Sequence, residues 1–145
     1  MSGHRRRLRE QLGNQSLAII SLVVALTALG YNTWRNEQSE FNRNIRRAGF
    51  EMLVHIAELQ RITYLSHFVG DPDGGNPRRG WVEVLILRDL AMLIPLSSDL
   101  RTDALYIAWN DNWTRLGESD LAVAAIDAAI DDLRGDVVAV LESLD

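Results

Sequence analysis

Three side chains that can coordinate metal ions are spaced to share one face of a helix. Glu51, His55 and Glu58 follow one another at intervals of four and three residues. Carboxylates and imidazoles hold metals inside helical bundles, where di-iron proteins repeat a Glu-x-x-His pattern on two helices. No Glu-x-x-His sequence occurs in this chain. The three residues are candidate metal ligands, but the pattern favours ordinary surface groups, and we expect no metal and no cofactor.

Other catalytic residue types are scarce or wrongly spaced. The chain has no cysteine, which excludes disulfides, thiolate metal sites and cysteine nucleophiles. It contains no Gly-x-Ser-x-Gly motif, phosphate loop or dinucleotide fingerprint. The segment from Asp71 to Asn76 resembles a calcium loop, but Gly75 and Val82 stand where oxygen ligands are required. We therefore predict a plain turn there and a protein that is not an enzyme.

A pair of tryptophans allows two interpretations. Trp109 and Trp113 are four residues apart, with Tyr106 one turn earlier. Aromatic residues at this spacing usually fill a hydrophobic core. They also anchor partner surfaces. The core is favoured, and a partner surface at Trp109 and Trp113 remains the alternative.

The charges are distributed unevenly. Residues 1–50 hold eight Arg and three acidic residues, whereas residues 51–145 hold seven Arg and seventeen acidic residues. An acidic domain repels phosphate backbones, so we expect no nucleic-acid partner. Every basic residue is Arg and none is Lys, a composition that we associate with GC-rich bacterial genomes.

An apolar segment follows the basic N-terminal residues 1–15. The run from Leu17 to Tyr31 has no charge, and charges resume only at Arg35. Tyr31 and Trp34 are suited to the headgroup level of a bilayer. We predict a single membrane-spanning helix over residues 16–34, short but sufficient for the roughly 17–25 residues that a span needs. The lipid bilayer is thus the first predicted partner.

Two alternatives for this segment stay open. Arg5, Arg6 and Arg7 before the run, with Ala28-Leu29-Gly30 near its end, also fit a cleaved signal peptide. The other alternative is a buried core helix of a soluble protein. The flanking Arg cluster and the aromatic residues favour the membrane-spanning helix over it.

The first 60 or so residues also resemble type IV prepilins. The resemblance lies in a short basic leader ending at Gly13, an apolar stretch and a long helix. It implies a pilin-like or secretion-system component. Ala18 stands where most pilins place a Glu, and no strand-rich half follows, so the resemblance is limited to the N-terminal part of the chain.

Small residues recur along one face of the predicted span. Ala18, Ser21, Ala25 and Ala28 follow at steps of three, four and three. Such a stripe permits close approach of another helix in lipid, so we expect another membrane protein or a homo-oligomer as partner. The dense N-terminal Arg cluster favours a cytoplasmic N-terminus and a periplasmic domain at a bacterial inner membrane.

The remaining residues, 35–145, predict a soluble helical bundle. Helical periodicity continues without a break to Val69, and the Gly- and Pro-rich segment 70–77 ends it. Further helices are expected at about 81–94, 99–116 and 120–144, with Ser98 as the cap of the helix at 99–116. The predicted fold class is all-α, with one N-terminal transmembrane helix continuing into a small antiparallel four-helix bundle.

These features together predict a non-catalytic, single-pass membrane protein. We expect it to act as an interaction or assembly subunit of a bacterial envelope complex. A ligand-sensing periplasmic bundle that signals through a partner is the alternative, and an immunity or phage-defence role fits the same features. No motif identifies the partner.

Overall fold

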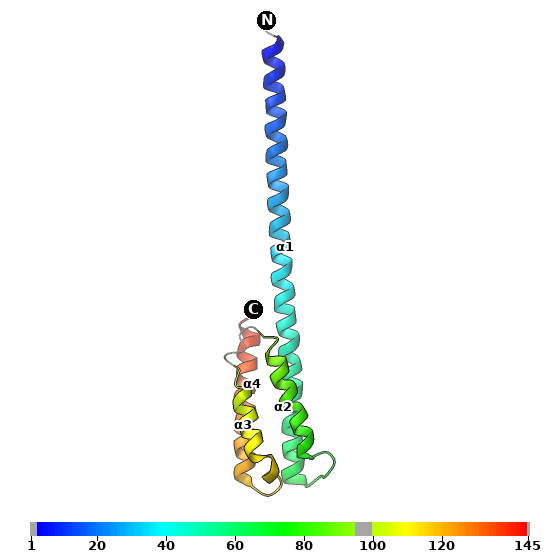
Figure 1. Ribbon diagram of the computed structural model, residues 1–145, viewed down its shortest axis with the longest axis vertical. Coiled ribbons are helices and arrows are strands. Elements are labelled where there is room, and N and C mark those ends of the chain that lie inside the picture. Colours follow the sequence, from blue (N-terminus) through cyan, green and yellow to red (C-terminus); the bar gives the residue numbers. More distant parts are fainter. Residues whose placement is uncertain (1–2, 95–99, 145) are drawn as a thin grey trace. The chain divides into compact units, whose positions relative to one another are not determined.

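All regular secondary structure in the described part of the chain is helical. The computed structural model describes residues 3–94 and 100–144, with side chains from residue 18 onward. Its elements are α1 (Gly3–Tyr64), the π-helical turn η1 (Leu65–Val69), α2 (Pro77–Ala91), α3 (Thr102–Asn112), the 3-10 turn η3 (Trp113–Arg115) and α4 (Asp120–Glu142) (Figure 1). The predicted all-α class is confirmed. The chain divides into two compact units, Met1–Phe41 and Asn42–Asp145, which are described separately.

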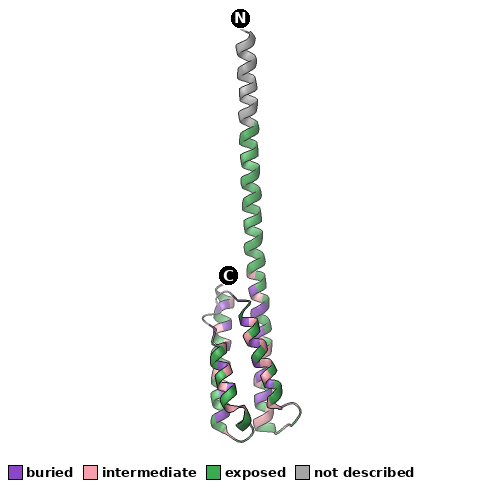
Figure 2. Ribbon diagram, viewed as in Figure 1, coloured by how far each residue is buried: buried purple, intermediate pink, exposed green. Residues whose placement is uncertain are grey.

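The described side chains of the first unit belong to α1 and are exposed. From residue 18 to residue 41 every described side chain is exposed (Figure 2). The large apolar members of the run before Arg35 are exposed by more than half of their area. They are Ile19, Ile20, Leu22, Val23, Val24, Leu26, Leu29, Tyr31 and Trp34.

The predicted transmembrane helix over residues 16–34 is not supported by the structure. No helix in the part with described side chains combines the length and the apolarity that crossing a membrane requires. The physical reason lies at the C-terminal end of the run, where Asn32 and Arg35 follow Leu29 closely. At the other end, residues 16 and 17 lie outside the described side chains.

The second unit is a helical bundle built around one hydrophobic core. The α1 residues from Asn42 onward lie beside α2, α3 and α4 (Figure 1). Each helix contributes apolar side chains at intervals of three and four residues, as an amphipathic helix must. The fully buried members include Met52, Ile56 and Leu59 of α1, Val84 and Leu87 of α2, Leu105 and Trp109 of α3, and Ile126, Ile130 and Leu133 of α4.

The start of α2 differs from the prediction. Asn76 caps the helix, because its side-chain oxygen accepts a hydrogen bond from the backbone N–H of Arg78 at 3.0 Å. Pro77 occupies the first helical position, where a missing N–H costs nothing. The helix therefore begins four residues before the predicted Trp81 and ends at Ala91 rather than Ile94.

The two later helices follow the predicted pattern with shorter ends. Helix α3 begins at Thr102, with no side-chain cap, and continues as the 3-10 turn η3 to Arg115. The predicted cap Ser98 lies outside the described residues. Helix α4 begins at Asp120, where the Ser119 side chain accepts from the backbone N–H of Ala122 at 3.2 Å. The predicted helix at 120–144 is thus present, with its end at Glu142.

Two acidic residues of α4 have opposite electrostatic surroundings. Arg101 holds the pKa of Asp136 below its ordinary value by a side-chain hydrogen bond, with Nη2 2.7 Å from Oδ1. Burial, and then the neighbouring Asp131, raise the pKa of Asp127. A lowered carboxyl pKa stabilises the fold above the unfolded value and a raised one has the opposite effect.

Isosteric amides at these two positions should therefore change stability in opposite directions. We expect Asp136→Asn to lower the melting temperature of the full chain in mild detergent near neutral pH, and Asp127→Asn to raise it. The Asp136 contribution is present above the unfolded Asp pKa of about 3.9 and is lost as the pH falls through the lower folded value. The Asp127 penalty appears as the pH rises past that same unfolded value and is complete above the raised folded value.

Thermal unfolding followed by circular dichroism at several pH values measures both effects. Each amide variant serves as the control for the other, since both remove one charge from the same helix. Shifts of the melting temperature in the same direction at neutral pH would contradict the opposite surroundings of the two carboxyl groups. An Asp136→Asn effect that persists unchanged in strong acid would contradict the ion pair with Arg101.

Candidate functional site

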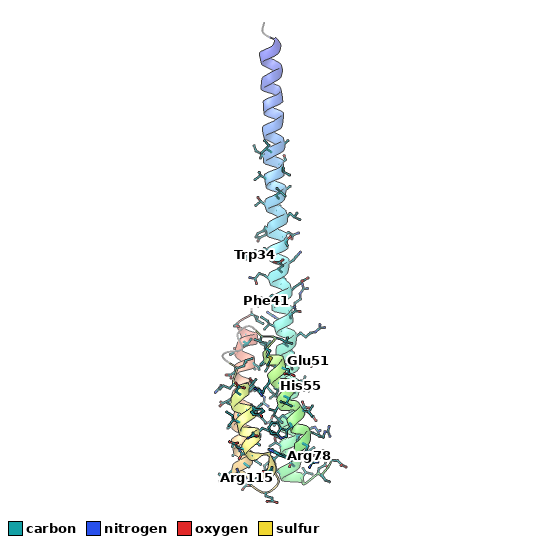
Figure 3. The ribbon with its side chains drawn as sticks, viewed as in Figure 1. Trp34, Phe41, Glu51, His55, Arg78 and Arg115 are labelled. Carbon is teal, nitrogen blue, oxygen red and sulfur yellow. The ribbon has the colours of Figure 1, made fainter. Side chains whose placement is uncertain are left out.

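The three candidate metal ligands are not assembled into a site. His55 Nδ1 lies 2.6 Å from Glu83 Oε2 of α2, so its partner is on another helix. Glu51 and His55 are labelled on α1 in Figure 3, and Glu51 is exposed. Glu58 instead accepts two hydrogen bonds from Arg61, at 2.7 and 2.8 Å. His55 and Glu58 are thus each paired with another side chain of the protein.

The charge of Glu58 is compensated within its own helix. The side-chain hydrogen bond from Arg61 holds the pKa of Glu58 below its ordinary value, although partial burial acts against it. Over the residues with described side chains, no group of three or more His, Cys, Asp or Glu is placed to hold a metal ion. In the described geometry, Glu51, His55 and Glu58 do not converge on a common metal ion.

Trp109 is part of the core and not of a partner surface. Its side chain is 0 % exposed, so it presents no surface to a partner in this structure. Trp113 is partly buried and packs edge-on against Trp81, with ring centroids 6.3 Å apart. Trp81 also packs against Tyr106, whose ring lies 4.6 Å below the guanidinium of Arg88. The aromatic residues therefore join α2 to α3.

The indole of Trp109 is packed directly against the backbone of α2. A Cβ atom at Gly80 would lie 2.1 Å from the Cζ2 atom of Trp109, far inside any allowed contact. The indole Nε1 is buried and has no hydrogen-bond partner among the described residues. The position of α2 against α3 thus requires glycine at residue 80.

The calcium-like loop is a turn held by its own carboxylate. Asp71 Oδ1 accepts from the backbone N–H groups of Asp73 and Gly74, at 2.9 and 3.1 Å. These two hydrogen bonds, the one from Gly74 first, hold the pKa of Asp71 below its ordinary value. The chain enters the loop through Gly70, whose φ of 66° lies in the left-handed region. Asp71 is therefore used for turn formation.

His67 ties the end of α1 to the start of α4. Its Nδ1 lies 2.9 Å from the carbonyl oxygen of Leu116, and its Nε2 lies 2.9 Å from a carboxylate oxygen of Asp120. Both partners are hydrogen-bond acceptors. Its contacts extend beyond the helix end to the turn before α4.

The most distinctive unassigned feature of the bundle is an apolar stripe on the outward side of α1 that continues into η1. We call it the outer stripe and define it as Phe50, Val54, Ala57, Arg61, Tyr64 and Phe68. All six residues are exposed, although α1 belongs to the core through its opposite side. Their intervals are four, three, four, three and four residues. This apolar periodicity is separate from that of the buried core residues of the same helix.

The small residues of the first unit have no described neighbour to pack against. Ala18, Ser21, Ala25 and Ala28 are all exposed on α1. Their proposed role in packing against another membrane helix remains a prediction.

Known proteins provide no further assignment for these surfaces. Comparison of the chain with protein-family models, curated proteins and solved structures found no match.

Proposed function

We propose that this is a non-catalytic, membrane-anchored helical protein that acts as an interaction or assembly subunit of a bacterial envelope complex. The observation that supports the proposal most strongly is the exposure of apolar side chains all around residues 18–29 of α1. A helix that is apolar on every side is found in a protein core or in a membrane.

Lipid suits this segment better than a protein groove does. Consecutive helical residues point about 100° apart, so Ile19, Ile20, Leu22, Val24 and Ala25 together cover every direction. A groove would contact one face and leave the others in water. Lipid surrounds a helix completely, which matches a segment without a polar face.

Two hydroxyl groups in and just after the segment are satisfied internally. Thr27 Oγ1 donates to the carbonyl oxygen of Val23 at 2.8 Å, and Thr33 Oγ1 donates to that of Leu29 at 3.0 Å. In hydrocarbon, where water is absent, such internal hydrogen bonds remove the cost of a free hydroxyl. Tyr31 and Trp34 follow with ring centroids 6.1 Å apart, and aromatic residues of this kind favour the headgroup level.

The proposed span uses residues on both sides of the described apolar side chains. Leu17 extends the run at its N-terminal end, and Tyr31 and Trp34 extend it into the interface. We propose that the Arg-rich residues before it stay on the cytoplasmic side, because basic residues near a span are retained there. The bundle is then periplasmic, and its surface is available for assembly.

Flotation with lipid vesicles tests the proposal. The full chain is mixed with phosphatidylcholine vesicles during detergent removal and then centrifuged through a density gradient in alkaline carbonate. We expect the chain to float with the lipid, because burial of the apolar run resists extraction. Recovery of folded, monomeric chain at the bottom of the gradient contradicts the proposal.

A further inference from the structure

We propose that the outer stripe of α1 pairs with the outer stripe of a second copy of this chain, as a parallel two-helix coiled coil. The stripe consists of the six residues defined above, all within the bundle unit. The parallel direction rests on the proposed function, because two copies anchored in one bilayer extend from it in the same direction. The pairing itself rests on spacing, exposure and charge.

The spacing is that of a heptad seam. The alternation of four and three residues repeats every seven residues, at Phe50, Ala57 and Tyr64 and again at Val54, Arg61 and Phe68, which keeps a seam facing a partner helix. Phe50, Ala57 and Tyr64 fall at d positions, and Val54, Arg61 and Phe68 fall at a positions. Val54 places a β-branched residue at an a position, as two-stranded parallel coiled coils do. A self-complementary seam of this kind specifies a second copy.

The seam offers enough apolar area for a stable contact. The exposed fractions are 60 % for Phe50, 62 % for Val54, 56 % for Tyr64 and 64 % for Phe68. From these fractions and the ordinary surface areas of such side chains, the four residues together expose roughly 450 Å² per chain. Two copies would bury on the order of 900 Å² from them alone, close to the roughly 1,000 Å² that a specific interface needs before its rim is added.

The one charged position of the seam is already neutralised. Arg61 donates two hydrogen bonds to Glu58, at 2.7 and 2.8 Å, so each copy brings an ion pair rather than a lone cation. A single polar residue at an a position sets register and the number of strands in coiled coils. Arg61 therefore fits the seam as its register-setting residue.

The apolar surface continues onto α4 beside Phe50. A shallow groove of about 250 Å³ is lined by Phe50, Val138 and Leu141, with Arg46 and Glu142 among its other lining residues. At the other end, Tyr64 and Phe68 stay on one side despite the π-helical turn, since their ring centroids are 5.3 Å apart. The seam thus has apolar residues at both ends.

Disulfide trapping tests the pairing, because the natural chain contains no cysteine. The variants are Val54→Cys and Tyr64→Cys in the full chain, reconstituted in vesicles and oxidised mildly. In the parallel pair each cysteine faces its own copy, so each variant alone forms disulfide-linked dimers. Ala128→Cys, exposed on α4, is the control and should link only at the rate of random collision.

Other outcomes overturn the inference in distinguishable ways. If neither single variant links but an equal mixture of the two does, the chains pair antiparallel and the parallel inference is wrong. If the chain floats with vesicles but neither the single variants nor their mixture links above the Ala128→Cys level, the pairing is wrong while the proposed membrane anchor stands. If linking occurs without flotation, the anchor is wrong and the pairing stands.

A substitution within the seam distinguishes specific pairing of two copies from their random collision. In the Tyr64→Cys background, Phe50→Glu should lower the linked fraction at least tenfold, because it places two like charges opposite each other. Glu51→Gln, next to it but outside the seam, should leave the fraction unchanged. Equal linking in both variants, with helical content intact by circular dichroism, overturns the inference.

Discussion

Gly80→Ala should destabilise the bundle strongly, although it adds only one methyl group. The new Cβ would lie 2.1 Å from Trp109 Cζ2 and 2.3 Å from its Cη2. The indole is 0 % exposed, so other atoms surround it on every side. Overpacking costs about 1–3 kcal/mol and more in severe cases, and the gain of about 1 kcal/mol in helix propensity does not offset a clash this close. We expect a fall in melting temperature of roughly 10 °C, measured by circular dichroism.

Two controls make this prediction specific. Gly135→Ala adds the same methyl group to α4, where no atom lies within 4 Å, and should stabilise the chain by about 0.5–1 kcal/mol. In a Trp109→Phe background, which removes the clashing ring, Gly80→Ala should cost much less than in the natural chain. Equal effects of the two glycine substitutions, or no coupling to Trp109, would contradict the packing described.

Val23→Arg combined with Leu26→Arg should abolish membrane association. An arginine at the centre of a membrane helix costs about 2.5–3.5 kcal/mol, so the two together lower partitioning by roughly four orders of magnitude. Both natural side chains are exposed and lie in the apolar segment, so no described packing contact is lost. Vesicle flotation of the full chain measures the effect, with circular dichroism to confirm that the bundle remains folded.

The matched control adds the same charge outside the apolar run. Asn32→Arg combined with Asn36→Arg also introduces two arginines, but at and beyond the interfacial aromatic residues, where long basic side chains reach water. This variant should float like the natural chain. If both double variants lose flotation equally, net charge and not the apolar segment governs association, and the anchor is wrong.

The helices of the bundle were largely predictable because each has one buried face. Ile126, Ile130 and Leu133 of α4 occupy successive turns, and the structure buries all three. The start of α2 was missed because Asn76 and Pro77 were assigned to the preceding turn. The same two residues are a side-chain cap and a preferred first helical residue, and only the backbone hydrogen bond to Asn76 distinguishes the two roles.

The site residues were less predictable because partner choice is a tertiary property. The spacing of Glu51, His55 and Glu58 places all three on one helix face. The residue that approaches His55, however, is Glu83 on α2. The contact between Gly80 and Trp109 joins residues on different helices and has no local sequence signal. The outer stripe was present in the spacing, yet a second apolar face becomes evident only once the first is known to be buried.

Thiol labelling of single cysteines along the apolar segment tests the proposed membrane anchor most directly. Leu22→Cys, Val23→Cys, Val24→Cys and Ala25→Cys replace four consecutive residues about 100° apart and so cover all sides of the helix, and Ser39→Cys is the exposed reference. In vesicles carrying the full chain, a charged maleimide should label all four positions much more slowly than Ser39→Cys. Fast labelling of all four positions, or protection confined to one helical face, would contradict insertion into lipid.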